Sequence, residues 1–273
     1  MEKLRVLYVS QEITPFLPET AISTIARKLP QGVQEIDKEV RVFMPRYGCI
    51  NERRHQLHEV IRLSGMNIII NDNDHPLIIK VASIPSARLQ VYFIDNEDYF
   101  KRKHVVNDDS GKFFEDNDER SIFFCRGVLE TVKKLGWVPD VIHCHGWMTA
   151  LMPAYVKKFY GDDPHFADTK VVYSVYDNGF AGSFDKKLAN KMKFDGFSEN
   201  ELSVLKSPDF VNLTKMAINF SDGVILGSEK VDAKISSHLK ETGKPVLNYH
   251  NEETYVAAYN EFYDKVAEEM LVD

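Results

Sequence analysis

The stretch Leu4–Ser23, LRVLYVSQEITPFLPETAIS, sets the fold class of the chain. It starts as an apolar run of strand length, passes through a turn, and ends where a helical pattern begins. Turns of this shape hold phosphate groups in many α/β proteins, because the helix N-terminus presents free amide N–H groups and a partial positive charge. This turn contains neither glycine nor lysine. It therefore has the outline of a phosphate-binding turn without the residues that would bind an anion.

Apolar runs of strand length alternate with helical patterns along the rest of the chain. The expected strands are 4–10, 39–45, 77–84, 89–95, 140–146, 170–176, 223–228 and 245–249. The expected helices are 20–36, 119–136, 148–160, 210–221 and 252–271. Several strands are almost wholly apolar, which is typical of strands covered on both faces. The alternation predicts an α/β fold, a mostly parallel sheet with helices on both faces.

The chain is expected to form one domain. Its 273 residues, 44% of them hydrophobic, are enough to bury a sizeable core. The polar segments 96–118 and 177–209 are interpreted as surface excursions from that core. The domain is predicted to span 1–250, and a helix at 251–273 packs back on it. The apolar stripe of that helix consists of Tyr255, Tyr259, Phe262, Val266 and Met270.

Composition excludes several classes of partner. The net charge is −7 and no long basic run occurs, so we expect neither nucleic acid nor an anionic membrane as a partner. No apolar run approaches the roughly 18 residues that span a bilayer, and the charged start does not resemble a signal peptide, so a cytoplasmic location is expected. The cysteines Cys49, Cys125 and Cys144 are scattered, and we expect them to be reduced and buried.

Ligands in an open α/β sheet bind beyond the carboxyl ends of the strands. There the sequence places His143 and His145 on one face of a strand, with Trp147 at the following turn. A third metal ligand is lacking nearby, so no metal is expected. We interpret His143 as a core histidine with satisfied hydrogen bonds. His145 and Trp147 are candidates for contact with a sugar, since an aromatic ring beside a polar donor suits a carbohydrate, although a turn tryptophan also serves in packing.

Four segments follow one another in order: VLYVSQEITPF from Val6, EVRVFMPRYG from Glu39, FEDNDERSIFFCRGVLETVKKLGWVPDVIHCHGW from Phe114, and NLTKMAINFSDGVILGS from Asn212. Together they resemble the N-terminal half of the glycogen and bacterial starch synthases, the family 5 glucosyltransferases that use ADP-glucose. The resemblance implies a single Rossmann-like domain like the N-terminal half of a GT-B glycosyltransferase. In the family, a second such domain holds most of the ADP-glucose, and the acceptor glucan lies largely on the first.

The resemblance fades near residue 230, and the remaining forty or so residues are too few for a second domain. The family's K-T-G-G-L loop corresponds here to Pro18, Glu19, Thr20, Ala21 and the following isoleucine, so the lysine and both glycines that approach the sugar nucleotide are absent. We interpret this as a degenerate donor loop. Proline at the first helical position and glutamate in the first turn would instead stabilise the helix N-terminus.

The acceptor motifs are retained only in part. The family's H-D-W-H corresponds to His145, Gly146, Trp147 and a methionine, and its I-H-N corresponds to a valine followed by Tyr176 and Asp177. The resemblance makes these five numbered residues, His145 to Trp147 and the Tyr176–Asp177 pair, the candidates for glucan or sugar binding. No catalytic residue and no cofactor can be assigned.

Three hypotheses follow. The first is a protein of glucan metabolism without autonomous glucosyl transfer, which binds a glucan or a small sugar, or else a protein partner or a second copy through an exposed cleft face. The second is an active ADP-glucose-dependent glucosyltransferase whose donor half comes from a partner or a dimer. The third is a nucleotide-sugar binder with a regulatory output, which the glutamate in the loop disfavours.

Overall fold

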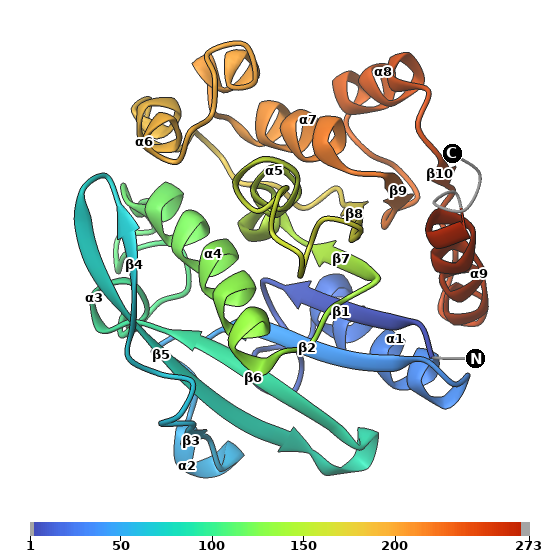
Figure 1. The fold of residues 1–273 in the computed structure, drawn as a ribbon, viewed down its shortest axis with the longest axis horizontal. Helices are drawn as coiled ribbons and strands as arrows, with labels where there is room; N and C mark the ends of the chain where they lie inside the picture. Colours follow the sequence, from blue (N-terminus) through green and yellow to red (C-terminus); the bar gives the residue numbers. More distant parts are fainter. Residues whose placement is uncertain (1–2, 269–273) are drawn as a thin grey trace.

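The computed structural model describes residues 3–268 and arranges them around a ten-stranded sheet (Figure 1). The strand order is β10-β9-β8-β7-β1-β2-β6-β5-β3, and β4 pairs with β5. The strands are β1 (Arg5–Ser10), β2 (Glu39–Pro45), β3 (His58–Glu59), β4 (Met66–Ile70), β5 (Asn73–Ile84), β6 (Leu89–Asp95), β7 (Val141–His145), β8 (Lys170–Val175), β9 (Gly223–Leu226) and β10 (Val246–Leu247). From β10 to β6 every pairing is parallel, so the predicted mostly parallel sheet is confirmed.

Antiparallel strands at one edge were not predicted. β5 runs antiparallel to β6, and β3 and β4 run antiparallel to β5. The hairpin between β4 and β5 turns at Asn71 and Asp72, both of which have positive φ. Asparagine and aspartate tolerate that conformation, which a two-residue hairpin turn requires. The local sequence therefore contained a hairpin signal, and β5 begins four residues before the predicted strand because it pairs with β4.

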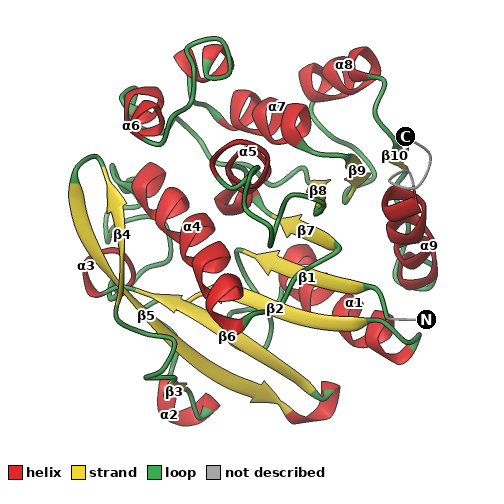
Figure 2. Cartoon of the chain, viewed as in Figure 1, coloured by secondary structure: helices red, strands yellow, loops and turns green. Residues whose placement is uncertain are grey.

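Helices cover both faces of the sheet, as predicted, with α4 in front of it and α1 behind it in Figure 2. The α-helices are α1 (Ala21–Glu35), α2 (Glu52–His55), α3 (Glu97–Phe100), α4 (Asn117–Leu135), α5 (Met152–Ala154), α6 (Leu188–Phe194), α7 (Phe210–Phe220), α8 (Ala233–Thr242) and α9 (Tyr255–Glu268). On one face α1 packs against β1 and β2, and α9 packs against α1. On the other, α4 packs against β2 and β6, and α5 and α7 pack against β8.

Two helix predictions need correction. The expected helix at 148–160 is broken into a 3₁₀ helix (Trp147–Thr149), the short α5 and a π-helical turn (Tyr155–Phe159), since Pro153 inside the segment has no amide N–H to donate. α8 was not predicted at all. The predicted helix at 252–271 begins later, at Tyr255, and its stripe is buried at Tyr255, Tyr259, Phe262 and Val266. Met270 lies outside the described residues.

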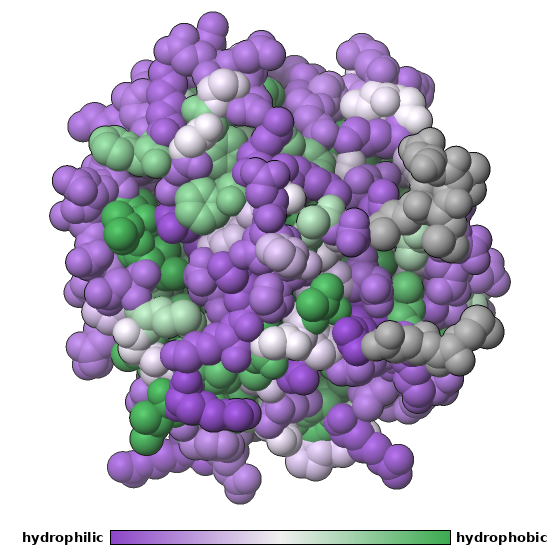
Figure 3. All heavy atoms as spheres, viewed as in Figure 1, coloured by the Kyte–Doolittle hydropathy of each residue, from purple (hydrophilic) through white to green (hydrophobic). Residues whose placement is uncertain are grey.

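The surface is mainly polar on the face that Figure 3 shows, where hydrophobic atoms form small separate groups. The exposed large hydrophobic residues are Ile36, Ile61, Ile69, Val138, Phe159, Phe194, Val246 and Tyr249. Cys49 is also exposed, contrary to the prediction, because it lies in the loop after β2, whereas Cys125 and Cys144 are buried as expected. Within residues 3–268 no helix combines the length and apolar character needed to cross a membrane.

Candidate functional site

The turn between β1 and α1 differs from the interpretation made from sequence. α1 begins at Ala21, and Thr20 is its N-cap, so Pro18 and Glu19 lie outside the helix and no acidic residue occupies its first turn. Thr20 Oγ1 accepts a hydrogen bond from Ser23 N (3.0 Å), and Ser23 Oγ accepts one from Thr20 N (2.8 Å). This reciprocal capping box satisfies helix donors that a bound anion would otherwise use. Helix capping therefore stabilises this turn, as expected, but the capping residues are Thr20 and Ser23 and not Pro18 and Glu19.

Glu12 stabilises the same turn through hydrogen bonds. The Thr20 hydroxyl donates a short hydrogen bond to the Glu12 carboxylate, and the Ser10 hydroxyl donates to the Glu12 carbonyl oxygen at 2.8 Å. Burial raises the pKa of Glu12, and the hydrogen bond from Thr20 opposes that rise. The glutamate of the E-x-x-P-F segment thus supports the loop and adds negative charge to this edge of the sheet.

His143 is a core residue, in line with its interpretation. Its side chain is completely buried, with Nδ1 2.7 Å from the Tyr263 hydroxyl and Nε2 2.7 Å from the Ser174 hydroxyl. Burial, helped by the neighbouring His145, holds the pKa of His143 well below its usual value. A neutral imidazole with both nitrogens occupied has no free position for a ligand.

His145 lies one layer closer to the end of the strand and is also completely buried. Its Nδ1 is 2.7 Å from the Tyr176 hydroxyl, and its Nε2 has no hydrogen-bond partner among residues 3–268. Burial lowers the pKa of His145 to about 3. His145 is therefore a neutral side chain that reaches the edge of the sheet through Tyr176.

Gly146 is required by the geometry of the turn after β7. Its φ is +87° and its ψ is 160°, a combination that side chains other than glycine rarely adopt. A Cβ at this position would lie 2.3 Å from the Gln11 side chain. Gln11 Oε1 accepts a hydrogen bond from Met148 N (3.2 Å), so Gly146 lets the β1 and β7 turns interlock.

Trp147 packs within an aromatic cluster with Phe113, Phe180 and Phe184. The ring centroids of Trp147 and Phe180 are 4.8 Å apart, and Phe113 stacks on Phe180 at the same distance. Only 6% of Trp147 is exposed. The phenylalanines come from the two polar segments that the sequence analysis placed on the surface, so these excursions cover the tryptophan. Of the two roles that the sequence left open for Trp147, sugar contact and packing, its contacts here are those of a packing residue.

Tyr176 and Asp177 follow β8 and differ in environment. The Tyr176 ring lies against Gly227, where an added Cβ would come within 2.5 Å of it. Asp177 is exposed, its amide N–H donates to Ser228 Oγ (3.0 Å), and Ser228 Oγ donates to Asp177 Oδ1 (3.0 Å). Tyr176 therefore faces the protein, whereas Asp177 closes a surface turn.

A cavity of about 290 Å³ lies beside the N-terminus of α1, at the carboxyl ends of β8 and β9. It is lined by Glu19, Thr20, Ala21, Thr24, Ile25, Tyr176, Gly227, Tyr249, His250, Glu252, Tyr255 and Tyr259. We call this the tyrosine cavity. It contains four tyrosines and two glutamates, and no lysine or arginine is among its described lining residues. Lys28, on α1, forms an ion pair with Glu252, with 3.0 Å between Lys28 Nζ and Glu252 Oε2.

The tyrosine cavity unites only some of the predicted residues. Glu19, Thr20, Ala21 and Tyr176 line it, while Pro18, His145, Gly146, Trp147 and Asp177 do not. His145 is linked to it through the Tyr176 hydroxyl. The segment from Tyr249 to Glu252 was not among the predicted site residues, and Tyr255 and Tyr259 were predicted only to pack. The sequence did contain one indication of this site: the apolar stripe of the last helix carries tyrosines, whose hydroxyl groups a purely apolar stripe does not need.

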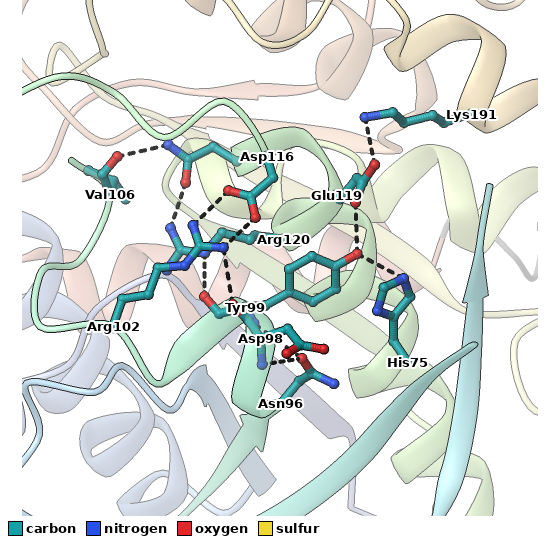
Figure 4. A network of polar contacts seen from close by, with 11 residues as sticks. His75, Asn96, Asp98, Tyr99, Arg102, Val106, Asp116, Glu119, Arg120 and Lys191 are labelled. Atoms are coloured by element: carbon teal, nitrogen blue, oxygen red, sulfur yellow. Dashed lines mark hydrogen bonds and ion pairs between the residues drawn. The ribbon is translucent and has the colours of Figure 1, made fainter. Parts of the chain in front are cut away.

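A second polar cluster, near the start of α4, was also missed (Figure 4). Lys191 on α6 lies 2.7 Å from Asp118 Oδ2 and 2.8 Å from Glu119 Oε1. The Tyr99 hydroxyl donates to Glu119 at 2.9 Å, and Arg120 Nε donates to the Tyr99 carbonyl oxygen at 2.8 Å. Burial raises the pKa of Asp118 to about 6, against the pull of Lys191. Lys191 ties the 177–209 excursion to α4, and Tyr99 ties the 96–118 excursion to it. Asp118 Oδ1 and Arg120 Nη2 are buried without a hydrogen-bond partner among residues 3–268.

A family model described as the starch synthase catalytic domain matches residues 5–248. A glycogen synthase from Chlorobium limicola is 37% identical over 219 residues, which cover 80% of this chain and 44% of the relative. One from Chlorobium phaeobacteroides is 40% identical over 189 residues, covering 69% of this chain and 39% of the relative. The chain thus spans less than half the length of these curated relatives.

A solved structure has the same fold. The catalytic domain of starch synthase IV from Arabidopsis thaliana, bound to ADP and acarbose, matches with a TM-score of 0.73 and 19% identity. The match covers 92% of this chain and 52% of the plant chain. The family motifs, the residues matched by the family model and the fold agree, and the chain belongs to the starch synthase catalytic domain family.

Proposed function

We propose that this glycogen/starch synthase-like protein acts in glucan metabolism as a glucan-binding domain and that it does not transfer glucose on its own. The observation that carries the proposal is the charge of the tyrosine cavity, where Glu19 and Glu252 line the wall and lysine and arginine are absent from the described lining.

Glucosyl transfer from ADP-glucose needs positive groups that stabilise the departing diphosphate. At the N-terminus of α1, Glu19 supplies negative charge, and the capping box of Thr20 and Ser23 occupies helix donors. A neutral glucan carries no such charge, so its binding meets no repulsion from the glutamates. The tyrosines offer the combination of ring surface and hydroxyl group that carbohydrates use.

The test combines a transfer assay with a binding assay on the purified full chain. ADP-glucose carrying a radiolabelled glucose is incubated with glycogen, and a two-domain glycogen synthase is assayed alongside to show that the conditions support transfer. Migration in native gels with and without glycogen measures binding, with serum albumin as the control. We expect retardation by glycogen and no label in the glucan. Robust transfer by a homogeneous sample would refute the proposal, as would unretarded migration.

Transfer that appears only when a second polypeptide is added would favour the alternative, an active ADP-glucose-dependent transferase with its donor half supplied by a partner or a dimer. A cleft face that binds a second domain or a second copy should be more apolar than ordinary surface. Of the large exposed hydrophobic residues, only Tyr249 also lines the tyrosine cavity among the described residues. Light scattering after size-exclusion chromatography tests for a dimer, and a monomer at all concentrations would refute self-association.

A further inference from the structure

Another cavity, of about 350 Å³, lies between the turn after β1, the middle of α1, the short helix α2 and the end of β5. We call it the arginine cavity, since its described lining includes Arg27, Arg54, His55, Ser83 and Ser86. It shares no described lining residue with the tyrosine cavity. Its volume lies within the range of about 300–1,000 Å³ that is typical of small-molecule sites. The proposed glucan-binding function uses none of these residues.

The titratable side chains described in the lining of the arginine cavity are all basic. No aspartate or glutamate is among them, although the chain as a whole carries a net charge of −7. Neither Arg27 nor Arg54 has an ion-pair partner within residues 3–268. The carboxylate of α2, Glu52, instead accepts hydrogen bonds from Arg46 Nε and Lys80 Nζ, each at 2.6 Å. The two guanidinium charges of the cavity are therefore available to an anion from outside the chain.

Arg27 is held in position by a serine of the cavity wall. Arg27 Nη2 donates a hydrogen bond to Ser86 Oγ at 2.8 Å, and Ser86 lies on the 3₁₀ turn Pro85–Ala87 that follows β5. This bond uses one of the five guanidinium N–H groups, and the Ser86 hydroxyl keeps its own hydrogen to donate. Two planar guanidinium groups beside hydroxyl donors match the oxygens of a phosphate group, which accept several charge-assisted hydrogen bonds.

The rest of the arginine cavity is largely apolar. Four apolar residues line it beside the basic groups: Pro15, Phe16, Ile84 and Pro85. The His55 ring packs edge-on against Phe16, with centroids 5.1 Å apart and planes inclined at 64°. Burial and the charge of Arg54 lower the pKa of His55, so its imidazole is neutral at pH 7 and extends the apolar wall. A free inorganic anion would leave this wall uncovered, whereas a phosphate carried on an organic group would cover it.

We infer that the arginine cavity binds a small organic phosphate monoester, with the phosphate on Arg27 and Arg54 and the organic group against Phe16 and His55. The site is separate from the tyrosine cavity, so the inference is independent of the proposed glucan-binding function.

Isothermal titration of the full chain with phenyl phosphate tests the inference, and inorganic phosphate, benzoate and tetraglutamate serve as comparison ligands. An ionic strength of about 0.15 M screens charges more than about 8 Å apart, so general attraction to the surface contributes little. We expect one phenyl phosphate to bind per chain. Inorganic phosphate lacks the organic group and benzoate carries a single charge, so each should bind at least about tenfold more weakly.

The double variant Arg27→Gln/Arg54→Gln removes both guanidinium groups and should weaken phenyl phosphate binding at least about tenfold. Arg53→Gln/Arg62→Gln is the matched control, because both arginines are exposed, lie on α2 and in the turn after β3, and are not among the described lining residues. The control loses the same charge and should bind phenyl phosphate within about twofold of the wild type. Circular dichroism spectra and urea unfolding verify that each variant is folded.

Absence of phenyl phosphate binding by the wild-type chain would overturn the inference. Equal affinities of the two folded double variants would do the same, since binding would then not depend on the cavity. Inorganic phosphate or benzoate that binds as tightly as phenyl phosphate would overturn the assignment to a phosphate ester. Tighter binding of tetraglutamate would overturn it in favour of an acidic peptide. Each of these results leaves the glucan-binding function to its own test, the migration with glycogen.

Discussion

Replacing Gly146 with alanine tests how the turns after β1 and β7 interlock. The residue has φ +87° and ψ 160°, which is an unfavourable conformation for alanine. The new methyl group would also lie 2.3 Å from Cδ and Oε1 of Gln11, so that side chain has to move. Its movement breaks the hydrogen bond from Met148 N to Gln11 Oε1 (3.2 Å) in a buried setting.

The magnitude follows from these two contributions. Backbone strain at such a position costs about 1–3 kcal/mol. Loss of a buried hydrogen bond adds about 1 kcal/mol. We therefore expect Gly146→Ala to lower the free energy of unfolding by about 2–4 kcal/mol. Gly182→Ala is the matched control, because Gly182 has φ +91° but an added Cβ meets no atom within 4 Å. It should cost the backbone strain alone, about 1–3 kcal/mol, without the collision and the lost hydrogen bond.

Urea unfolding monitored by circular dichroism measures both variants, with an unchanged m-value as the check on two-state behaviour. The Gln11→Ala substitution separates the collision from the strain. In that background Gly146→Ala should cost less than in the wild type, giving a coupling energy in a double-mutant cycle. Equal losses for Gly146→Ala and Gly182→Ala, together with a cycle that is additive, would refute the interlocking of the two turns.

Three further predictions concern buried polar groups. Burial lowers the pKa of His145 to about 3, so the unfolded chain binds a proton that the folded chain excludes between about pH 6.5 and 3. Stability should fall as pH falls through that window, and His145→Gln should remove up to about 3 kcal/mol of the fall in unfolding free energies measured from pH 7 to 4. Lys191→Met leaves the Asp118 carboxyl, which has no exposed surface, without its nearest cation, and should destabilise the chain by about 3–5 kcal/mol in urea unfolding. Tyr263→Phe removes a hydrogen bond to a buried histidine and should cost about 1–3 kcal/mol in the same assay, whereas Tyr259→Phe, whose hydroxyl has no partner in the described chain, should change stability little.

Controls for these variants are available in the same chain. Lys193 is half-exposed and pairs with the exposed Glu199, so Lys193→Met should change stability by less than about 1 kcal/mol. A pH profile of His145→Gln identical to that of the wild type would show that His143 or other groups cause the acid sensitivity. A Lys191→Met variant as stable as Lys193→Met, or equal losses for Tyr263→Phe and Tyr259→Phe, would contradict the corresponding assignments.

The hydrophobic periodicity of the sequence predicted most of the strands and helices, because the pattern of each element is contained in a short run of residues. The parallel strands from β10 to β6 and the helix α4 lie within a few residues of their predicted ranges. Short elements such as β3 and α8 were missed, since two to ten residues of mixed polarity carry little periodic signal. α1 begins one residue after the start of its predicted range, but Pro18 and Glu19 were wrongly assigned to its first turn, because Thr20 and Ser23 were not recognised as a capping pair.

The candidate site was predictable only in part. The loss of lysine and glycine between Pro18 and Ala21 is visible in the sequence, and so is the position of His145 at the end of a strand. The burial of His145 and Trp147 was not, because it depends on Tyr176 and on phenylalanines from two distant loops. Burial is a property of everything that surrounds a side chain.

By itself the sequence determined the α/β class, the family resemblance and the absence of a phosphate-binding lysine at the first turn, since each is written in a contiguous run of residues. Only the tertiary structure decided that Tyr255 and Tyr259 stand opposite Glu19 in one cavity. More than 200 residues separate these walls, and no local periodicity fixes where a C-terminal helix will pack. The contacts of α9 with α1 and with the buried histidine layer determine that position, because they bury its apolar stripe.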